Sequence, residues 1–218
     1  MTYRMRPLLG ILCAAAVALT VSAGVFAAPP GKETVARTKA DDAKAAALVV
    51  HKGDLPAGWT GGKAKPNISG DLGCSNYRPK QSDLVLTGAA ATHWQRQGAA
   101  IYAQVQILRT PKMVKLDWQR TVVDPRVLPC IRKGLATRAK VVSFGRVAFP
   151  HLAHYSIALR AVLKVAAQGE TQVELDTVDI GAGRVEIGFS ISGPASEKSA
   201  LRSVALKTAG TLAKRLHG

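Results

Sequence analysis

Residues 154–192 read HYSIALRAVLKVAAQGETQVELDTVDIGAGRVEIGFSIS and decide the fold that the sequence predicts. Apolar side chains recur at every second position along Tyr155–Val165 and again along Val185–Ile191, which is the period of a strand with one buried face. Turn residues interrupt this pattern at Gln168–Glu170 and at Gly181–Gly183. Because connections this short join strands that run in opposite directions, the stretch predicts an antiparallel meander.

The same signals extend the pattern toward both ends of the chain. Strands are predicted at Ala89–Arg96, Ala99–Arg109, Arg138–Phe149, His154–Ala167, Thr171–Ile180 and Arg184–Ser192, with a hairpin turn at Gln97-Gly98. Apolar residues at helical spacing, bounded by capping residues and breakers, predict helices at Ala40–Lys52, from Pro111 to the break at Asp124-Pro125, at Val127–Gly134 and at Ser196–Leu216. Residues 60–83 carry six glycines and prolines and are expected to form a loop.

This order of elements predicts an α+β fold. We expect one antiparallel sheet of about six strands with helices packed on one face, in the order α-β-β-α-β-β-β-β-α. Neither a repeat nor an internal linker divides the chain, so residues 40–217 are expected to form a single domain.

The N-terminal residues are typical of a secretory signal peptide. Arg4 and Arg6 precede an uncharged stretch rich in Leu, Ala and Val, and Val25-Phe26-Ala27 provides the small residues that a signal peptidase requires. We therefore expect residues 1–27 to be a signal peptide and residues 28–39 a flexible lead-in. The mature protein would then be secreted or extracytoplasmic, without a transmembrane span. The alternative is an uncleaved anchor, because an uncharged stretch of about 20 residues can span a bilayer.

Two cysteines, Cys74 and Cys130, remain once a signal peptide is removed. An even number of cysteines in an exported chain indicates a structural disulfide. A reactive thiol or a metal ligand is the alternative, but the sequence contains neither a C-x-x-C motif nor a His/Cys cluster. His151 and His154 are the only histidines close in sequence, and beside Pro150 they are expected to be solvated. The sequence thus predicts no metal and no cofactor.

The chain is strongly basic, with 30 Lys and Arg residues against 14 Asp and Glu residues and a net charge of +16. Nine of these cations form what we call the basic segment, a candidate anion-binding surface: Lys112, Lys115, Arg120, Arg126, Arg132, Lys133, Arg138, Lys140 and Arg146. Such a field attracts anionic envelope polymers or lipid headgroups. Specific binding of nucleic acid is not expected, because no aromatic residues are interleaved for base stacking. A generally basic, solvated surface is the alternative.

Catalytic motifs are absent, since the sequence has no G-x-S-x-G, no S-x-x-K and no P-loop. The acidic residues that follow residue 169 could serve hydrolysis: Glu170, Glu174, Asp176, Asp179 and Glu186. The alternative is structural, because a turn at Gln168–Glu170 would place Lys164 opposite Glu174 on the outer, solvated face. Arg160 and Asp176 are expected on that same face. Trp59, Trp94 and Trp118 are candidates to line a ligand cleft, with core packing as their alternative role.

One short motif supports a resemblance to a known group. Asp54-Leu55-Pro56-x-Gly58-Trp59 follows the first helix, and then come Cys74, a two-strand unit, a helix with Pro129-Cys130, a strand meander and a final amphipathic helix. In these features the chain resembles actinobacterial-type secreted envelope proteins and is loosely similar to the PknH-like extracellular sensor domain. The resemblance implies an antiparallel sheet flanked by helices, a central cleft, a binding role and no catalytic residues. It covers residues 40–216 and transfers no site residues.

The sequence therefore favours an exported, non-enzymatic binding or sensor-type domain of the cell envelope. Its ligand would lie in a cleft between sheet and helices, with cations steering an anionic partner. Two alternatives remain: a secreted hydrolase using Glu174, Asp176 or Glu186, and a surface protein that binds polyanions. Two carboxylates that converge in a pocket would favour the hydrolase.

If Cys74 and Cys130 form a disulfide, Cys130→Ser and Cys74→Ser should lower the melting temperature equally under oxidising conditions. Closing so long a loop should stabilise the protein by about 4 kcal/mol in the chain-entropy model. Calorimetry with and without reductant measures the effect, and a loss confined to one of the two variants would show that the pairing is wrong.

Overall fold

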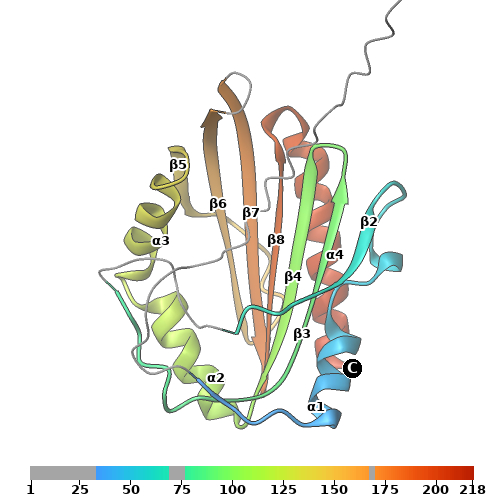
Figure 1. Cartoon of the computed structure of the whole chain (residues 1–218), viewed down its shortest axis with the longest axis vertical. Coiled ribbons are helices and arrows are strands. Elements are labelled where there is room, and N and C mark those ends of the chain that lie inside the picture. Colours follow the sequence, from blue (N-terminus) through green and yellow to red (C-terminus); the bar gives the residue numbers. More distant parts are fainter. Residues whose placement is uncertain (1–32, 69–76, 167–169) are drawn as a thin grey trace, which may run out of the picture.

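The structure is a computed structural model that describes residues 33–68, 77–166 and 170–218, drawn in Figure 1. The strands are β1 (Thr34–Val35), β2 (Thr60–Ala64), β3 (Val85–Arg96), β4 (Ala99–Leu108), β5 (Lys140–Arg146), β6 (Tyr155–Ala166), β7 (Glu170–Ala182) and β8 (Val185–Pro194). The helices are α1 (Lys39–Leu48), α2 (Pro111–Trp118), α3 (Val127–Ala136) and α4 (Lys198–His217), with a π-helical turn at Gln119–Val123. All strands belong to one sheet of order β1-β3-β4-β8-β7-β6-β5, and β2 also pairs with β3.

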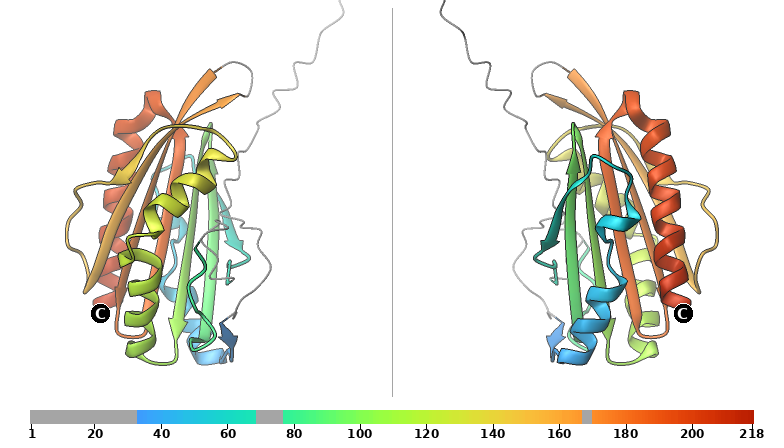
Figure 2. Two further views of the ribbon diagram at one scale, coloured as in Figure 1. Left: turned by 90° about the vertical axis from the view of Figure 1, so that its left-hand side faces the viewer. Right: turned by 90° about the vertical axis from the view of Figure 1, so that its right-hand side faces the viewer.

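The α+β class is confirmed, and so is the antiparallel pairing of β3 with β4 and of β5 through β8. The finer prediction is wrong in two ways. The sheet has eight strands and is mixed, because β1 runs parallel to β3. Helices also lie on both faces: α1 and α4 pack on one side, and α2 and α3 lie toward the other (Figure 2). The two residues of β1 fall within the predicted lead-in and are too few to show a period.

The first face of the sheet and the helices α1 and α4 enclose the main hydrophobic core. Strand β4 contributes Ile101, Ala103, Val105 and Ile107, and β8 contributes Val185, Ile187, Phe189 and Ile191. Helix α4 covers them with a stripe that includes Leu201, Ala205, Ala209 and Leu212. Full burial of each large aliphatic side chain contributes about 1.5–3 kcal/mol, so this side of the sheet dominates the stability.

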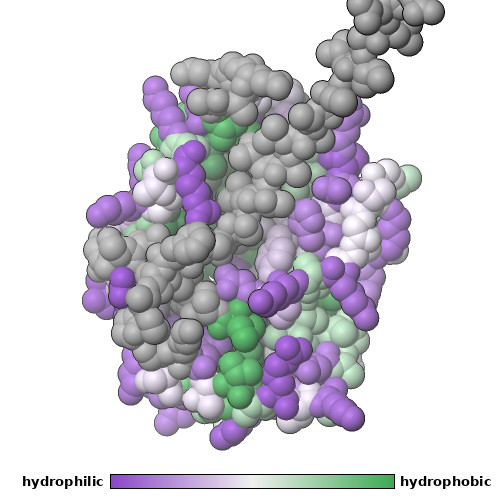
Figure 3. Space-filling model, viewed as in Figure 1, coloured by the Kyte–Doolittle hydropathy of each residue, from purple (hydrophilic) through white to green (hydrophobic). Residues whose placement is uncertain are grey.

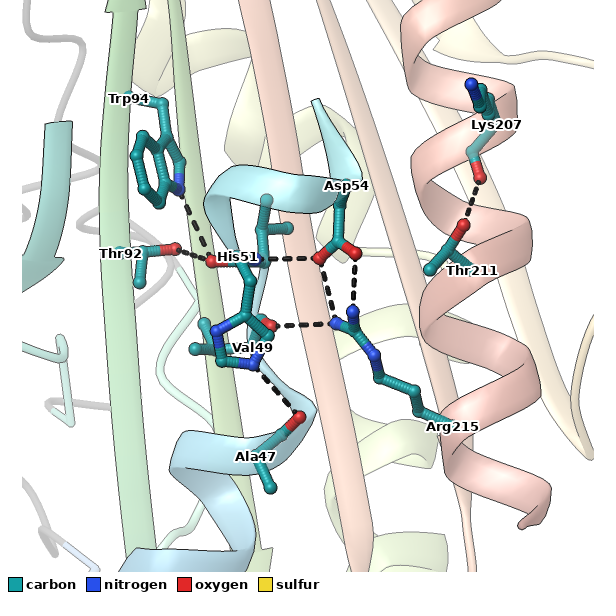
Figure 4. A network of polar contacts seen from close by, with 10 residues as sticks. Ala47, Val49, His51, Asp54, Thr92, Trp94, Lys207, Thr211 and Arg215 are labelled. Carbon is teal, nitrogen blue, oxygen red and sulfur yellow. Dashed lines mark hydrogen bonds and ion pairs between the residues drawn. The ribbon is translucent and has the colours of Figure 1, made fainter. Parts of the chain in front are cut away.

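The D-L-P-x-G-W motif fixes the chain between α1 and β2 to the end of α4 (Figure 4). The Asp54 carboxylate accepts hydrogen bonds from the Arg215 guanidinium, with Nη1 to Oδ2 at 2.8 Å, and from the backbone N–H of His51 at 2.7 Å. Arg215 also donates to the carbonyl of Val49 at 3.2 Å. Trp59 is fully buried in the core, with the Arg96 guanidinium 5.4 Å from its ring centroid. The motif that carries the resemblance therefore has a packing role.

The acids near the start of β7 are buried, which corrects the predicted outer face. Strands β6 and β7 pair up to Ala166 and Glu170, so Lys164 lies opposite Gln172, two residues from the predicted register. Glu174 and Asp176 are only 4% and 7% exposed. Arg202 of α4 donates to Glu174 at 2.6 and 2.7 Å.

The second of these acids, Asp176, pairs within the sheet. Arg160 donates to both of its carboxylate oxygens, at 2.6 and 2.9 Å. Both acids are therefore ion-paired on the side of the sheet that α4 covers.

The prediction of a loop across residues 60–83 is wrong at β2. Glycines that suggested a loop allow a very close strand pairing instead, because a Cβ on Gly61 would lie 2.1 Å from the carbonyl oxygen of His93. The φ of Gly61 is +146°, which side chains other than hydrogen rarely permit.

None of the helices in the described residues is long and apolar enough to cross a membrane. The predicted signal peptide and the first residues of the lead-in fall within residues 1–32, outside the described residues.

Gly61→Ala should destabilise the protein by about 1–3 kcal/mol, because β2 must move away from β3 or lose its pairing. Gly62→Ala is the matched control, since within the described residues nothing lies within 4 Å of the Cβ it would add. That variant should change the free energy of unfolding by no more than about 0.5 kcal/mol. Urea unfolding followed by tryptophan fluorescence compares the two, and equal effects would contradict the close approach at Gly61.

Candidate functional site

The second face of the sheet lies beneath α2, the π-helical turn and α3, and it bounds a cavity of about 750 Å³. Alternation along each strand creates this arrangement, because the residues between the core positions point to the opposite face. The register aligns Gln104 of β4, Gly188 of β8, Asp179 of β7 and Ile157 of β6 across the floor. All four residues line the cavity.

Most of the cavity wall is apolar. The sheet side includes Phe144, Ile157, Leu159, Ala161 and Leu175, and the helical side includes Trp118, Val122, Val127, Leu128, Ile131 and Leu135. The Trp118 ring lies 5.1 Å from that of Tyr155, which begins β6. These walls can bury an apolar body of considerable size.

Three carboxyl groups from three elements line another part of the wall: Asp117 of α2, Asp179 of β7 and Glu186 of β8. With Glu33, which interacts electrostatically with Asp117 and Glu186, we call them the carboxyl cluster. The carboxyl groups of Glu186 and Asp117 hydrogen-bond to each other. Gln81 Nε2 donates to Asp117 Oδ1 at 3.0 Å. This part of the cavity therefore has a dense set of oxygen atoms.

Burial controls the protonation of the carboxyl cluster. Desolvation, reinforced by the charge of Asp117, raises the pKa of Asp179 to about 7 and the pKa of Glu33 to about 7. Desolvation also raises the pKa of Asp117, and that of Glu186 lies well above its usual value. Their mutual hydrogen bond raises the pKa of Glu186 and lowers that of Asp117, which corresponds to a Glu186 carboxyl that donates to Asp117.

The segment after β2 crosses the edge of this face and is tied to β4. The backbone N–H of Asn67 donates to Gln104 Oε1 at 2.6 Å, and Gln106 Nε2 donates to the Asn67 carbonyl at 3.1 Å. The Tyr102 hydroxyl donates to the Lys65 carbonyl at 3.2 Å. These contacts give the cavity an amide- and hydroxyl-lined border next to the carboxyl cluster.

The structure disperses the basic segment. Only Lys133 and Arg138 of its nine cations line the cavity. Arg120 donates to both oxygens of Asp83, at 2.7 and 3.0 Å, and Arg126 pairs with Asp124 at 2.7 Å. Arg146 donates to the Val122 carbonyl at 3.1 Å. The remaining members are exposed, namely Lys112, Lys115, Arg132 and Lys140. Hydrophilic residues accordingly line the side of this face where α2 and α3 lie (Figure 3).

The three tryptophans separate into two environments. Trp118 lines the cavity, whereas Trp59 and Trp94 belong to the core beneath α1 and α4. The Trp94 indole N–H donates to the Val50 carbonyl at 3.3 Å, as Figure 4 shows.

Cys130 is fully buried beside Tyr77 and Val127 and is disulfide-bonded. Its predicted partner, Cys74, lies outside the described residues, so the Cys74–Cys130 pairing stays a prediction.

The acids proposed for hydrolysis do not meet. Of the three acids Glu174, Asp176 and Glu186, only Glu186 lines the cavity. Glu174 and Asp176 lie on the side of the sheet that α4 covers. In the cavity Glu186 meets Asp179, which the sequence analysis grouped with it, and Asp117, which the sequence analysis did not. Asp117 comes from a helix about 70 residues before Glu186, and the pairing of β4 with β8 brings α2 above Glu186. The one signal in the sequence that could have pointed to Asp117 is that it is an acid among the apolar residues of a predicted helix.

Fold and cavity together define an α+β domain with a partly apolar chamber between a sheet and its helices. No family model matches the sequence, and no curated protein matches it. Similar solved structures include an uncharacterised Mycobacterium smegmatis protein orthologous to Rv0999, with 14% identity and a TM-score of 0.48 over 82% of this chain and 97% of that chain. The extracellular domain of PknH from Mycobacterium tuberculosis has 10% identity and a TM-score of 0.42 over 79% of this chain and 96% of that chain.

A third similar structure is LpqN, a Mycobacterium tuberculosis protein involved in cell envelope biogenesis. It has 13% identity and a TM-score of 0.35 over 72% of this chain and 77% of that chain. The loose similarity to actinobacterial-type envelope proteins and to the PknH-like extracellular sensor domain that the sequence indicated is thus confirmed, and it concerns the fold alone.

Compared with wild type, Asp179→Asn should raise the free energy of unfolding at about pH 8. At about pH 4 the gain over wild type should be smaller. A carboxyl whose pKa is about 7 when folded and about 4 when unfolded binds its proton more tightly in the folded state, so stability falls as the pH rises between these values. Asparagine removes this loss, with a gain of roughly 1–3 kcal/mol at the higher pH. Urea unfolding at both pH values measures it.

Asp83→Asn is the control of opposite sign, because Arg120 lowers the pKa of Asp83 to about 2. Its carboxylate stabilises the folded state at neutral pH, so this variant should lose stability there and lose less in acid. An effect of Asp179→Asn that is the same at both pH values would contradict the raised pKa.

Proposed function

We propose that this protein is an exported, non-enzymatic binding domain of the cell envelope that holds an amphiphilic molecule in the cavity between the sheet and α2–α3. The observation that carries the proposal is the divided lining of that cavity. Apolar side chains form most of it, and the carboxyl cluster with neighbouring amides and hydroxyls forms the rest. A ligand with an apolar body and a polar head matches both parts.

The size of the cavity supports a ligand rather than a packing defect. Its volume of about 750 Å³ lies within the range of about 300–1,000 Å³ that is usual for small-molecule sites. A void of this kind costs stability, because the residues around it lose packing contacts. The core beneath α1 and α4 bears most of the hydrophobic burial, so the fold does not need the second face to be filled.

Asp117, Asp179 and Glu186 converge in the cavity, which is the arrangement expected to favour the hydrolase, but the direct contact between two of them disfavours glycoside hydrolysis. In glycoside hydrolysis two carboxyl groups flank the scissile bond at about 5–9.5 Å from each other. Asp117 and Glu186 instead hydrogen-bond directly to each other, which leaves no room for a bond between them. Glu174 and Asp176 are held by Arg202 and Arg160 away from the cavity.

The exposed cations support a second step of the proposal, which concerns location. Lys112, Lys115, Arg132 and Lys140 present positive charge on the outside of the molecule. Such charges attract an anionic envelope polymer or lipid headgroups over several ångströms and hold the domain close to its source of ligand. The partner of this surface is thus distinct from the molecule inside the cavity.

Filling the cavity should abolish binding of an apolar probe. Ala161 is 2% exposed and lines the apolar wall, so Ala161→Phe places a ring where the apolar body would lie. The fluorescence of neutral N-phenylnaphthylamine, which increases in an apolar environment, should titrate with wild type and be displaced by dodecanol. Affinity should fall at least about tenfold in the variant, because more than 1.4 kcal/mol of apolar contact is lost.

Leu206→Ala is the matched control, because Leu206 is an exposed apolar residue of α4, the helix on the other side of the sheet. It should bind the probe as wild type does. Loss of binding in both variants, or in neither, would place the probe elsewhere, and the absence of any binding to wild type would refute the proposed function.

A further inference from the structure

We propose that the carboxyl cluster binds a primary ammonium group, so that the molecule in the cavity is a long-chain amine. This inference rests on the proposed function and specifies the headgroup that the cavity selects. It follows from an imbalance between hydrogen-bond acceptors and donors around the cluster, and from the absence of cationic partners for it among the described residues.

The oxygen atoms that lack partners at the cluster are acceptors. Glu33 Oε2 and Gln81 Oε1 are buried without a hydrogen-bond partner in the described part of the chain, and their residues are only 6% and 3% exposed. Gln81 is bonded to Asp117 through its amide nitrogen, so both of these residues lie behind Asp117 rather than in the cavity lining itself. Buried polar atoms are seldom left unpaired, because each costs about 1–3 kcal/mol.

No positive side chain of the described residues forms an ion pair with these acids, although the charge of Arg120 acts to lower the pKa of Asp117. Across residues 33–68, 77–166 and 170–218, no ion pair includes Glu33, Asp117, Asp179 or Glu186. Yet the protein carries an excess of 16 positive charges. Nearby arginines are already paired, as Arg120 with Asp83 shows. Lys133 and Arg138 line the same cavity and the charge of Arg120 acts on Asp117, yet no ion pair joins a cation of the described residues to these four acids, which leaves a place for a cation from outside.

The donor set points to an organic cation rather than a metal ion. In the described residues no three His, Cys, Asp or Glu side chains converge with the geometry that a metal ion needs. An ammonium group offers three N–H donors in a compact volume, which suits several separated carboxyl oxygens. Trp118, Tyr102 and Phe144 also line the cavity, so dodecyltrimethylammonium serves as the probe for a quaternary ammonium group held by aromatic rings.

Asp179 is the member of the cluster best placed to face the headgroup. It lines the cavity opposite Gly188, where a Cβ would come within 3.0 Å of Asp179 Oδ1, so glycine keeps space beside this carboxyl. No residue in the described ranges donates a hydrogen bond to it. The raised pKa of Asp179 is what an unneutralised carboxyl shows, and a bound ammonium group would lower it.

Competition against N-phenylnaphthylamine at about pH 8 tests the inference with ligands of equal chain length. Dodecylamine should bind at least about tenfold more tightly than dodecanol, dodecanoate and dodecyltrimethylammonium, since a hydrogen-bonded ion pair is stronger than a neutral contact. Asp179→Asn should reduce dodecylamine to the affinity of dodecanol. Glu197→Gln removes an acid that pairs with Arg96 away from the cavity, and should leave the tenfold preference intact.

The choice of ligands and variants distinguishes failure of the ammonium site from failure of the proposed function. Equal affinity for amine and alcohol would overturn the ammonium site while leaving the proposed function intact, whereas failure of every probe, including dodecanol, would overturn both. A preference for dodecylamine that survives in Asp179→Asn and in Glu186→Gln would also overturn the assignment to the cluster. Butylamine should compete at least about a hundredfold less well than dodecylamine, and equal competition would mean that the site binds a small free amine.

Discussion

Burial of one face of the sheet beneath α1 and α4 is the constraint on which the rest of the molecule depends. The residues at alternate positions of β4 and β8 form a continuous apolar surface, and α4 covers it with leucine and alanine side chains. Since this layer supplies most of the buried apolar surface, the stability of the fold does not depend on close packing against the opposite face. Helices α2 and α3 can then stand away from the sheet and leave a chamber between them.

The chamber combines features that a stable core would avoid. Four acids lie in or beside it without ion pairs in the described residues, and two buried oxygen atoms lack partners. Elsewhere arginine side chains form ion pairs with the buried acids, as Arg202 does with Glu174 and Arg215 with Asp54. The contrast between the two faces supports the proposal of binding in this region, because carboxyl groups with strongly raised pKa values gather at functional sites.

Much of the fold could be predicted from local patterns. The alternation in Val185–Ile191 and the turn at Gly181–Gly183 correctly gave a hairpin, and Pro111 correctly marked the start of a helix. The errors arose where a distant strand decides the outcome. Gly61 was expected in a loop because its strand exists only through contact with His93 and Trp94. Lys164 was expected opposite Glu174 rather than Gln172, because a turn assigned one residue too late shifts the pairing of the two strands by two residues.

The sequence by itself determined the α+β class, the meander and the amphipathic final helix, because periods of two and 3.6 residues record which side of an element is buried. It also gave the charge of the surface. Only the tertiary structure decided that Asp117, Asp179 and Glu186 meet, since they come from a helix and two strands whose register is set by long-range pairing. Local patterns specify whether a residue is buried, but the partner with which it is buried depends on contacts between segments far apart in the chain.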